Sequence, residues 1–169
     1  MKRKLYLLNS FVAALVFSGC AGYRLGGTHP EGIETVTMAP VINKSTEPAI
    51  ELQVTHAMRE RIQFDGRLQL VNEPKNADAI MEITLTSYQL SAIAFHNDSK
   101  TTAKIYRLKI SGEAKLKSTK TGKEISRSST YGESTFEFDS DLTGSKRDAL
   151  PYAAKEIAKF MFDDLVEQW

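Results

Sequence analysis

The sequence predicts an α+β fold, a two-layer sandwich in which two amphipathic helices pack on one mostly antiparallel sheet of about four to five strands. Two segments repeat their apolar residues every three or four positions, which is the period of one helix face. Other segments alternate apolar with polar residues, which is the period of a strand with one buried side. The segments follow the order strand, helix, four strands, helix, and this order predicts a sheet covered by two helices.

The first 19 residues have the composition of a secretory signal peptide. Three basic residues at positions 2–4 precede an apolar stretch that runs to Phe17, and two small residues follow. A basic start, a short apolar run and a small-residue exit are typical of a removable export signal. The apolar run is shorter than the roughly 20 residues that span a bilayer. We therefore expect residues 1–19 to be removed.

Cys20, which is the only cysteine, follows these small residues directly. The stretch from Phe17 to Cys20 resembles a bacterial lipobox, whose cysteine takes a diacylglyceryl group and becomes the mature N-terminus. A single cysteine cannot form an intramolecular disulfide, whereas acyl chains such as palmitate contribute roughly 0.8 kcal/mol of membrane binding per buried methylene. We expect Cys20 to be lipidated, and an incidental cysteine is the alternative. In bacterial lipoproteins a non-acidic residue after the cysteine directs the protein to the outer membrane. Because Ala21 follows Cys20, the resemblance implies that this protein is located there.

Residues 20–32 are rich in glycine and contain Pro30, which predicts a linker between the lipid and a single domain of residues 33–169. About a dozen linker residues span at most roughly 40 Å, so we expect the domain to work close to its membrane. Three of the 22 basic residues and none of the 21 acidic residues lie in the signal peptide, which leaves a net charge of −2. Nucleic-acid binders usually have a strong basic excess, so this class is not expected.

Five segments have the residue pattern of strands. The pattern is clearest in the fourth segment, where five apolar residues are predicted to face the core and six polar or charged residues to face water. A turn at Thr121 and Gly122 is predicted to join the last two segments as a hairpin. The five predicted strands span residues 33–41, 67–71, 79–90, 104–117 and 124–138.

Two segments have the residue pattern of amphipathic helices. Thr46 is the predicted N-cap of the first helix, and Gly66 is the predicted end. The second helix is predicted over residues 148–168, with Asp148 as its N-cap and Pro151 in its first turn. These two helices supply the second layer of the predicted sandwich.

Several stretches after the signal peptide occur in an order that matches a known family. They are "CAGYRLGG", "PEGIETVTMAPVINKSTEP", "DGRLQLVNEPKNADAIMEITLTSY", "YRLKISGEAKL" and "TGKEI", and an alanine-rich helix then ends at Trp169. Together they cover residues 20–169 and resemble the LPS-assembly lipoprotein family, LptE. The resemblance implies a lipoprotein at the inner face of the outer membrane that associates with the large β-barrel LptD. It also implies that the protein supports barrel assembly and helps to deliver lipopolysaccharide to the outer leaflet.

Four basic residues on predicted strand 104–117 are candidates for binding lipopolysaccharide. This lipid carries phosphate and carboxylate groups, so a binder needs clustered cations on a rigid backbone. The four residues alternate with the predicted core residues and therefore face water. Solubilisation is the alternative, because lysines on an exposed or edge strand also deter aggregation, and the acidic Glu113 in the same row argues against a dedicated anion site. The candidates are Arg107, Lys109, Lys115 and Lys117.

A second candidate surface is the stretch "SAIAFHNDSKTT", residues 91–102, between two predicted strands. Ile93 and Phe95 lie near the predicted hairpin tip and are exposed there unless something covers them. Exposed apolar clusters often mark contact sites. We expect Ile93 and Phe95 to contact the interior wall of a partner, and packing under a loop of the protein itself is the alternative.

The sequence predicts neither an enzyme nor a cofactor or metal site. The three histidines, His29, His56 and His96, fall in a predicted linker, helix and loop, without the spacing of metal ligands. Neither a Gly-x-Ser-x-Gly elbow nor a phosphate-binding glycine loop is present. The neighbouring Asp163 and Asp164 are predicted to lie on the solvent side of the second helix, where carboxylates mainly solubilise.

A different lipoprotein function is the alternative to lipopolysaccharide transport. Small α+β lipoproteins of the outer membrane also activate cell-wall synthases or serve as accessory secretion factors. An activator that reaches across the periplasm normally has a long disordered linker after its cysteine, and here only about a dozen residues precede the first predicted strand. The short linker favours a partner in the outer membrane itself.

Overall fold

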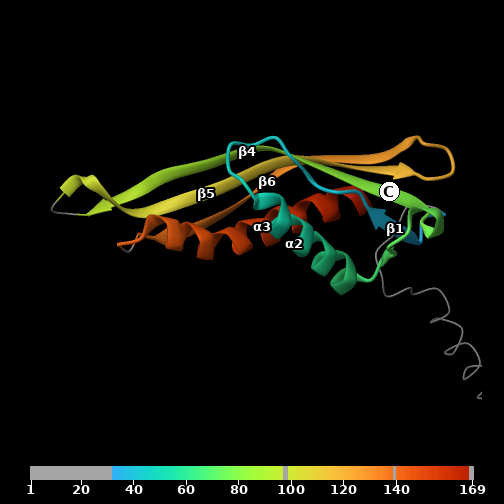
Figure 1. The fold of residues 1–169 in the computed structure, drawn as a ribbon, viewed down its shortest axis with the longest axis horizontal. Coiled ribbons are helices and arrows are strands. Elements are labelled where there is room, and N and C mark those ends of the chain that lie inside the picture. The colour runs from blue at the N-terminus through green and yellow to red at the C-terminus, as the bar shows by residue number, and fades with distance from the viewer. Residues whose placement is uncertain (1–31, 97–98, 139, 168–169) are drawn as a thin grey trace, which may run out of the picture.

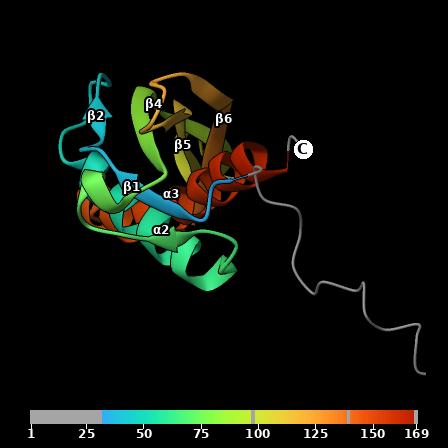
Figure 2. The ribbon, with the colours of Figure 1, turned by 90° about the vertical axis from the view of Figure 1, so that its right-hand side faces the viewer.

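The computed structural model describes residues 32–96, 99–138 and 140–167, which form a sheet with two long helices on one of its faces (Figures 1 and 2). The α+β class and the two layers are therefore confirmed. The elements are β1 (Thr35–Met38), β2 (Ile42–Asn43), α2 (Ile50–Asp65), β3 (Gln69–Leu70), the 3₁₀ helix η2 (Pro74–Asn76), β4 (Ala79–His96), β5 (Ser99–Ser118), β6 (Glu124–Glu137) and α3 (Leu142–Val166).

The described part of the sheet has six strands in the order β3-β1-β4-β5-β6, and β2 pairs with β4. The long strands β4, β5 and β6 are antiparallel, as predicted. The short strands β1, β2 and β3 instead pair in parallel. The sheet is thus mixed and has one strand more than predicted, because the two residues of β2 are too few to show a period.

The core lies between the helices and one face of the sheet. The predicted alternation in the fourth strand segment is confirmed, because Leu108, Ile110, Ala114 and Leu116 are buried while the residues between them are more exposed, except Gly112. Tyr106 is only partly buried. The largest fully buried side chains come from α2, α3, β4 and β5, and they are Ile50, Met58, Ile62, Met81, Ile83, Leu85, Leu108, Ile110, Leu116, Ile157, Met161 and Phe162.

The start of α2 differs from the prediction. Thr46 does not cap this helix, which begins four residues later and has Ala49 at its N-cap position in a left-handed conformation with φ of 65°. The preceding loop is held instead by Asn43, whose Nδ2 donates to Glu47 O at 2.8 Å and to Glu51 Oε2 at 2.9 Å. Gly66 ends the helix with φ of 76°, as predicted, because glycine adopts a left-handed backbone at little cost.

The start of α3 also differs from the prediction. Asp148 is not its N-cap, since the helix begins at Leu142 and Asp141 caps it by accepting a hydrogen bond from Thr143 N at 2.9 Å. Pro151 consequently lies inside the helix instead of in its first turn. The prediction placed Pro151 where its missing N–H costs nothing, but burial of the alanine-rich face extends the helix across it.

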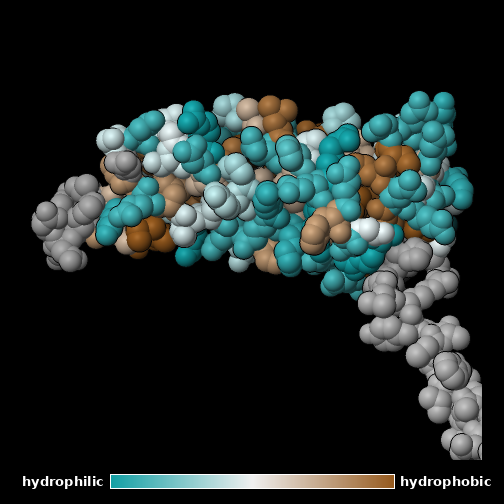
Figure 3. All heavy atoms as spheres, turned by 90° about the horizontal axis from the view of Figure 1, so that it is seen from below, coloured by the Kyte–Doolittle hydropathy of each residue, from teal (hydrophilic) through white to brown (hydrophobic). Residues whose placement is uncertain are grey.

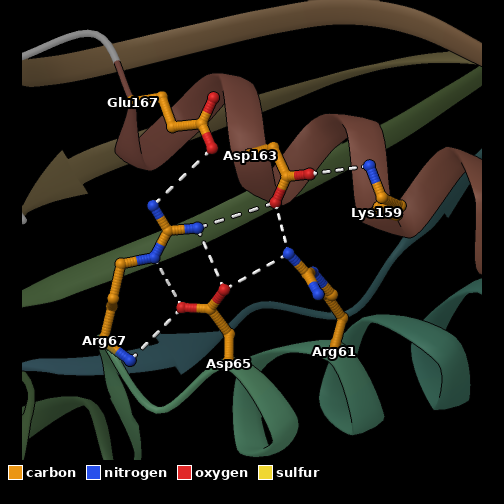
Figure 4. A network of polar contacts seen from close by, with 6 residues as sticks. All are labelled: Arg61, Asp65, Arg67, Lys159, Asp163 and Glu167. Carbon is orange, nitrogen blue, oxygen red and sulfur yellow. Dashed lines mark hydrogen bonds and ion pairs between the residues drawn. The ribbon is translucent and has the colours of Figure 1, made fainter. Parts of the chain in front are cut away.

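A network of charged side chains joins the end of α2 to α3 (Figure 4). Asp163 accepts from the Arg61 guanidinium and lies 3.1 Å from Lys159 Nζ. Asp65 pairs with Arg67 at 2.6 Å and with Arg61 at 3.2 Å. Asp163 is thus a partner in this network, which corrects its predicted solvent position, whereas Asp164 is exposed. Because the cations and carboxylates compensate one another, we interpret the network as a structural link.

The electrostatics of this network agree with a structural role. Burial raises the pKa of Asp65, but the hydrogen bonds and charge of Arg67 lower it by more, so the carboxyl pKa lies below its usual value. The hydrogen bond to Asp65 raises the pKa of Arg67. The guanidinium carbons of Arg61 and Arg67 lie 5.6 Å and 5.5 Å from the centre of the buried Phe162 ring, a favourable cation–π distance. The network therefore covers the ring with paired charges.

Asp78 connects the start of β4 to the start of β1. Its Oδ2 accepts from Thr35 Oγ1 at 2.8 Å and from the backbone N–H groups of Thr35 and Glu34 at 3.2 Å and 3.3 Å. These hydrogen bonds, the one from the Thr35 hydroxyl foremost, lower the pKa of Asp78 to about 2. The carboxylate thereby holds the end of the domain that follows the predicted linker.

Candidate functional site

The sheet face opposite α2 and α3 carries the four predicted basic residues. Arg107, Lys109, Lys115 and Lys117 lie on one face of β5, between the residues whose side chains are buried against the helices. No described helix covers this face (Figure 2). At about 3.3 Å per residue the row spans roughly 33 Å. The structure thus brings the four residues together as an extended row, which we call the basic row.

Most cations of the basic row have close partners within the protein. Arg107 lies 3.5 Å from Glu133 Oε1, and Lys117 lies 2.7 Å from Glu82 Oε2. Lys109 Nζ lies 3.6 Å from the centre of the Tyr131 ring. Each partner comes from a neighbouring strand and lies two residues from the position that pairs directly with its cation. The row is therefore balanced by carboxylates at both of its ends.

Lys115 differs from the rest of the row. It makes neither an ion pair nor a ring contact among the described residues, although its pairing partners in the sheet are Glu82 on β4 and Arg127 on β6. The hydrogen bond from Arg127 lowers the pKa of Glu124, and the charge of Lys115 lowers it further. Lys115 and Lys109 are thus the two cations of the row whose ammonium groups form no ion pair in the described structure.

The position of β5 bears on the alternative explanation of the row. β5 lies between β4 and β6 and is not an edge strand. The lysines of the row therefore do not protect a sheet edge from aggregation, which removes that part of the alternative. General solubilisation of an exposed face remains as the other explanation.

The predicted contact residues Ile93 and Phe95 lie inside β4 and not in a loop, because β4 continues to His96 and β5 begins at Ser99. Pairing between β4 and β5 continues beyond Leu90, where the sequence no longer alternates apolar with polar residues. Ile93 is 42% exposed and Phe95 is 48% exposed. Both side chains are therefore accessible near the hairpin end in the part of the chain that the structure describes.

Aromatic side chains gather at the same end of the sheet. The rings of Tyr106 and Phe136 stack with their centres 5.8 Å apart, and Phe138 meets Tyr106 edge-on at 6.1 Å. Tyr106 is also the pairing partner of Ala92 on β4. We call Ile93, Phe95 and this aromatic group the distal end, since β1 lies at the opposite end of the sheet (Figure 1).

The helix side presents a surface that the sequence did not indicate. Seen from this side, hydrophobic residues form separate patches among hydrophilic ones (Figure 3). Phe64 on α2 is 85% exposed and borders a shallow groove of about 200 Å³ between α2 and α3. In the sequence, the only sign of this surface is that Phe64 is apolar but does not fall on the periodic buried side of α2. The groove is lined by Ala57, Glu60, Arg61, Phe64, Lys155 and Lys159.

The predicted lipidation site Cys20, the signal peptide 1–19 and almost all of the linker 20–32 lie outside the described residues. Within the described residues no helix combines the length and apolar character needed to cross a membrane. The same residues contain no cluster of three histidine, cysteine or acidic side chains that could hold a metal ion.

Comparison with known proteins identifies one family. The family model described as "LptE: Lipopolysaccharide-assembly" matches residues 33–168, which is most of the chain. None of the curated proteins compared matches the sequence.

Solved structures are similar to this chain at low sequence identity. The hypothetical protein CT253 from Chlamydia trachomatis is 9% identical, with a TM-score of 0.51 over 79% of this chain and 93% of its own. The lipoprotein GNA1162 from Neisseria meningitidis is 16% identical, with a TM-score of 0.47 over 69% of this chain and 94% of its own. PelC from Paraburkholderia phytofirmans, a dodecamer, is 14% identical, with a TM-score of 0.46 over 82% of this chain and 94% of its own. At these identities the likeness to CT253 shows the fold alone.

Proposed function

The chain belongs to the LptE lipopolysaccharide-assembly family, and from this premise we propose that it is an outer-membrane lipoprotein that partners an LptD-type β-barrel in lipopolysaccharide transport. The match over residues 33–168 is the observation that carries the proposal. In this proposal Cys20 is acylated, residues 1–19 are removed, and the domain faces the periplasm on a short linker. The protein acts by binding, without catalysis.

The shape of the domain supports contact with a partner at the distal end. β4 runs from Ala79, beside the linker end of the domain, to His96 at the hairpin. At about 3.3 Å per residue, Ile93 lies roughly 45 Å along the strand from Ala79. An anchor at Cys20 therefore holds one end of the domain at the lipid, while the exposed apolar residues reach well beyond it. A protein partner is better suited to cover them than the lipid surface at the anchor.

The first test is recovery of the barrel with the lipidated protein. Replacing both Ile93 and Phe95 by serine is expected to lower the amount of LptD barrel that copurifies from detergent-solubilised outer membranes by at least about tenfold, since a few buried apolar anchors usually dominate an interface. The protein carries an affinity tag, and the barrel is quantified by immunoblot against wild type.

The matched control replaces two other exposed apolar residues, Leu52 and Phe64 on α2, by serine. This variant is expected to recover the barrel like wild type. Equal loss in both variants would remove the distal end from the proposal. If wild type recovers a cell-wall synthase and no barrel, the alternative function applies.

The basic row is proposed as a contact for lipopolysaccharide. Its extended form fits a ligand with several anionic groups, and its rigid strand fixes the spacing of the cations. Arg107 forms an ion pair with Glu133, and Lys117 forms one with Glu82. Lipopolysaccharide would have to displace these carboxylates to bind through either cation. Lys109 and Lys115, which form no ion pair among the described residues, are therefore expected to contribute most.

Reversing the charge at Lys109 and Lys115 to glutamate is expected to weaken binding of purified lipopolysaccharide by at least about tenfold, because each charge-assisted hydrogen bond contributes about 1.5–3 kcal/mol. Binding is measured by titration calorimetry or by capture of labelled lipopolysaccharide. The control makes the same change at Lys75 and Lys155, which are exposed and lie off the sheet face. Unchanged binding in a folded Lys109→Glu, Lys115→Glu variant would leave the row with a solubilising role.

A further inference from the structure

One side of β4 is an open sheet edge along most of its length. β5 pairs with the other side of β4 throughout. On the open side, β1 pairs only with residues 79–81 and β2 only with residues 84–85. Beyond Leu85 none of the described strands pairs with this side. We call residues 86–95 on this side the β4 edge.

Hydrogen bonds at the start of β4 show which backbone groups face the edge. Met81 O accepts from Ala39 N at 3.0 Å and Leu85 O accepts from Lys44 N at 2.9 Å, so odd-numbered residues point outward up to Leu85. The register shift between Leu85 and Ser87 inserts one residue and reverses this alternation. The residues that direct their N–H and C=O groups into the open edge are therefore Tyr88, Leu90 and Ala92.

The β4 edge lacks the residues that usually protect an edge strand. The sequence from Ile83 to Phe95, "ITLTSYQLSAIAF", contains no charged residue, no proline and no glycine. Natural proteins normally blunt exposed edges with charges, proline, bulges or a covering segment. Of these devices the β4 edge has only register shifts at its two ends, between Leu85 and Ser87 and from Ala92 to His96, so residues 87–92 between them are regular. A long, uncharged edge with high strand propensity is a template for pairing with another chain.

The opposite edge of the same sheet is protected in the usual way. The outward N–H of Glu133 on β6 donates a short hydrogen bond to the Glu156 carboxylate of α3. β6 also carries Arg127, Glu133 and Glu137 among its exposed or partly exposed residues. The β6 edge thus has a capped N–H and charged residues, whereas residues 86–95 of β4 have neither in the described structure.

We propose that the β4 edge binds an extended segment of the barrel partner by strand addition. The segment hydrogen bonds to Tyr88, Leu90 and Ala92, and its apolar side chains cover Ile93 and Phe95. The segment is expected to be uncharged where it pairs with residues 89–95, because none of these residues carries a charge. This inference rests on the proposed function and specifies how the distal end contacts its partner.

A second copy of this chain fits the edge less well. Antiparallel pairing of two copies that sets the outward residues opposite one another is centred on Leu90 and places Tyr88 opposite Ala92. It leaves Ile93 opposite Ser87 and Phe95 opposite Leu85, whose outer side β2 already occupies. Bringing Ile93 opposite Phe95 shortens the paired segment to residues 92–96. The exposed apolar side chains thus do not cover one another in an extended symmetric pair, whereas a different strand can present apolar residues at matching positions.

Replacing Ala92 by proline tests the strand addition. Ala92 is exposed, and its N–H faces the open edge and not β5. Proline removes this donor and blocks an added strand, so the yield of the complex with the coexpressed LptD barrel is expected to fall at least tenfold. In the wild-type complex, hydrogen exchange of the Leu90 and Ala92 amides is expected to slow at least tenfold relative to the free protein.

Two matched variants serve as controls. Ala92→Thr keeps the N–H at the same position, and Ser129→Pro removes an outward N–H from the protected edge of β6. Both are expected to form the complex within twofold of wild type. Circular dichroism and thermal melting establish that each variant is folded.

The outcomes separate this inference from the proposed function. If wild type forms no complex with the barrel, the proposed function is wrong. If wild type and a folded Ala92→Pro variant form it equally, or the edge amides stay unprotected, strand addition is wrong and the proposed function stands. If the protein alone dimerises and Ala92→Pro makes it monomeric, a second copy occupies the edge and the inference is overturned.

Discussion

Replacing Phe162 by alanine is expected to lower the free energy of unfolding by about 4 kcal/mol, within the range for a large buried aromatic residue. Phe162 is a residue of α3 and is fully buried in the core. Alanine removes the ring and leaves a cavity beneath the guanidinium groups of Arg61 and Arg67, which lie over the ring. Urea unfolding of the protein without its signal peptide and acyl chains, followed by circular dichroism, measures the change.

Phe160, two residues away on the same helix, provides the control. It is 38% exposed, so Phe160→Ala is expected to cost less than about 1 kcal/mol, because a large part of its surface stays in water in the folded protein and truncation there leaves no closed cavity. Phe162→Leu, which keeps most of the volume, is expected to cost less than about 1.5 kcal/mol. Equal destabilisation by the alanine variants at 160 and 162 would contradict the assignment of Phe162 to the core.

Replacing Gly132 by alanine is expected to destabilise the protein by about 3 kcal/mol, the upper part of the usual range for overpacking. A methyl group at this position of β6 would lie closer than 3.0 Å to Ile157 N, Ala153 O and Ile157 Cβ of α3. Two of these atoms belong to the backbone, so the helix itself must move away from the sheet. A shift of the urea midpoint with an unchanged slope would measure this cost.

The variant Thr130→Ala controls for a change on the same face of β6, two residues before Gly132. It is expected to cost less than about 1 kcal/mol, because it adds no atom against α3. Adding Ile157→Ala to Gly132→Ala is not expected to restore stability, since the backbone atoms of α3 remain in place. Full rescue by the double variant would show that the contact depends on the Ile157 side chain instead.

Local patterns predicted most of the regular structure. The apolar residues of α2 and β5 repeat with the period of their own element, so their buried sides could be read along the chain. Gly66 ended α2 as predicted, because its conformation depends on one residue. The N-caps were wrong at Thr46 and Asp148, because several polar residues compete for each cap and packing of the helix chooses among them.

For the basic row, the sequence pattern predicted the positions of the cations but not their partners. The alternation within β5 placed all four cations on one face, which the structure contains. Their partners, Glu82 on β4 and Glu133 on β6, lie on other strands, so no spacing in the sequence indicated that Lys117 and Arg107 are engaged. Ile93 and Phe95 were found as exposed apolar residues, but their place within a paired strand depends on β5.

The sequence by itself determined which residues of each helix and strand have a buried side, because that information repeats within a few positions of the chain. The tertiary structure alone decided which edge of the sheet is open, how closely α3 approaches Gly132, and which charges surround Phe162. These features depend on strand order and on contacts between residues far apart in the chain. Local periodicity carries no record of such contacts, since each element has the same period whichever neighbour it meets.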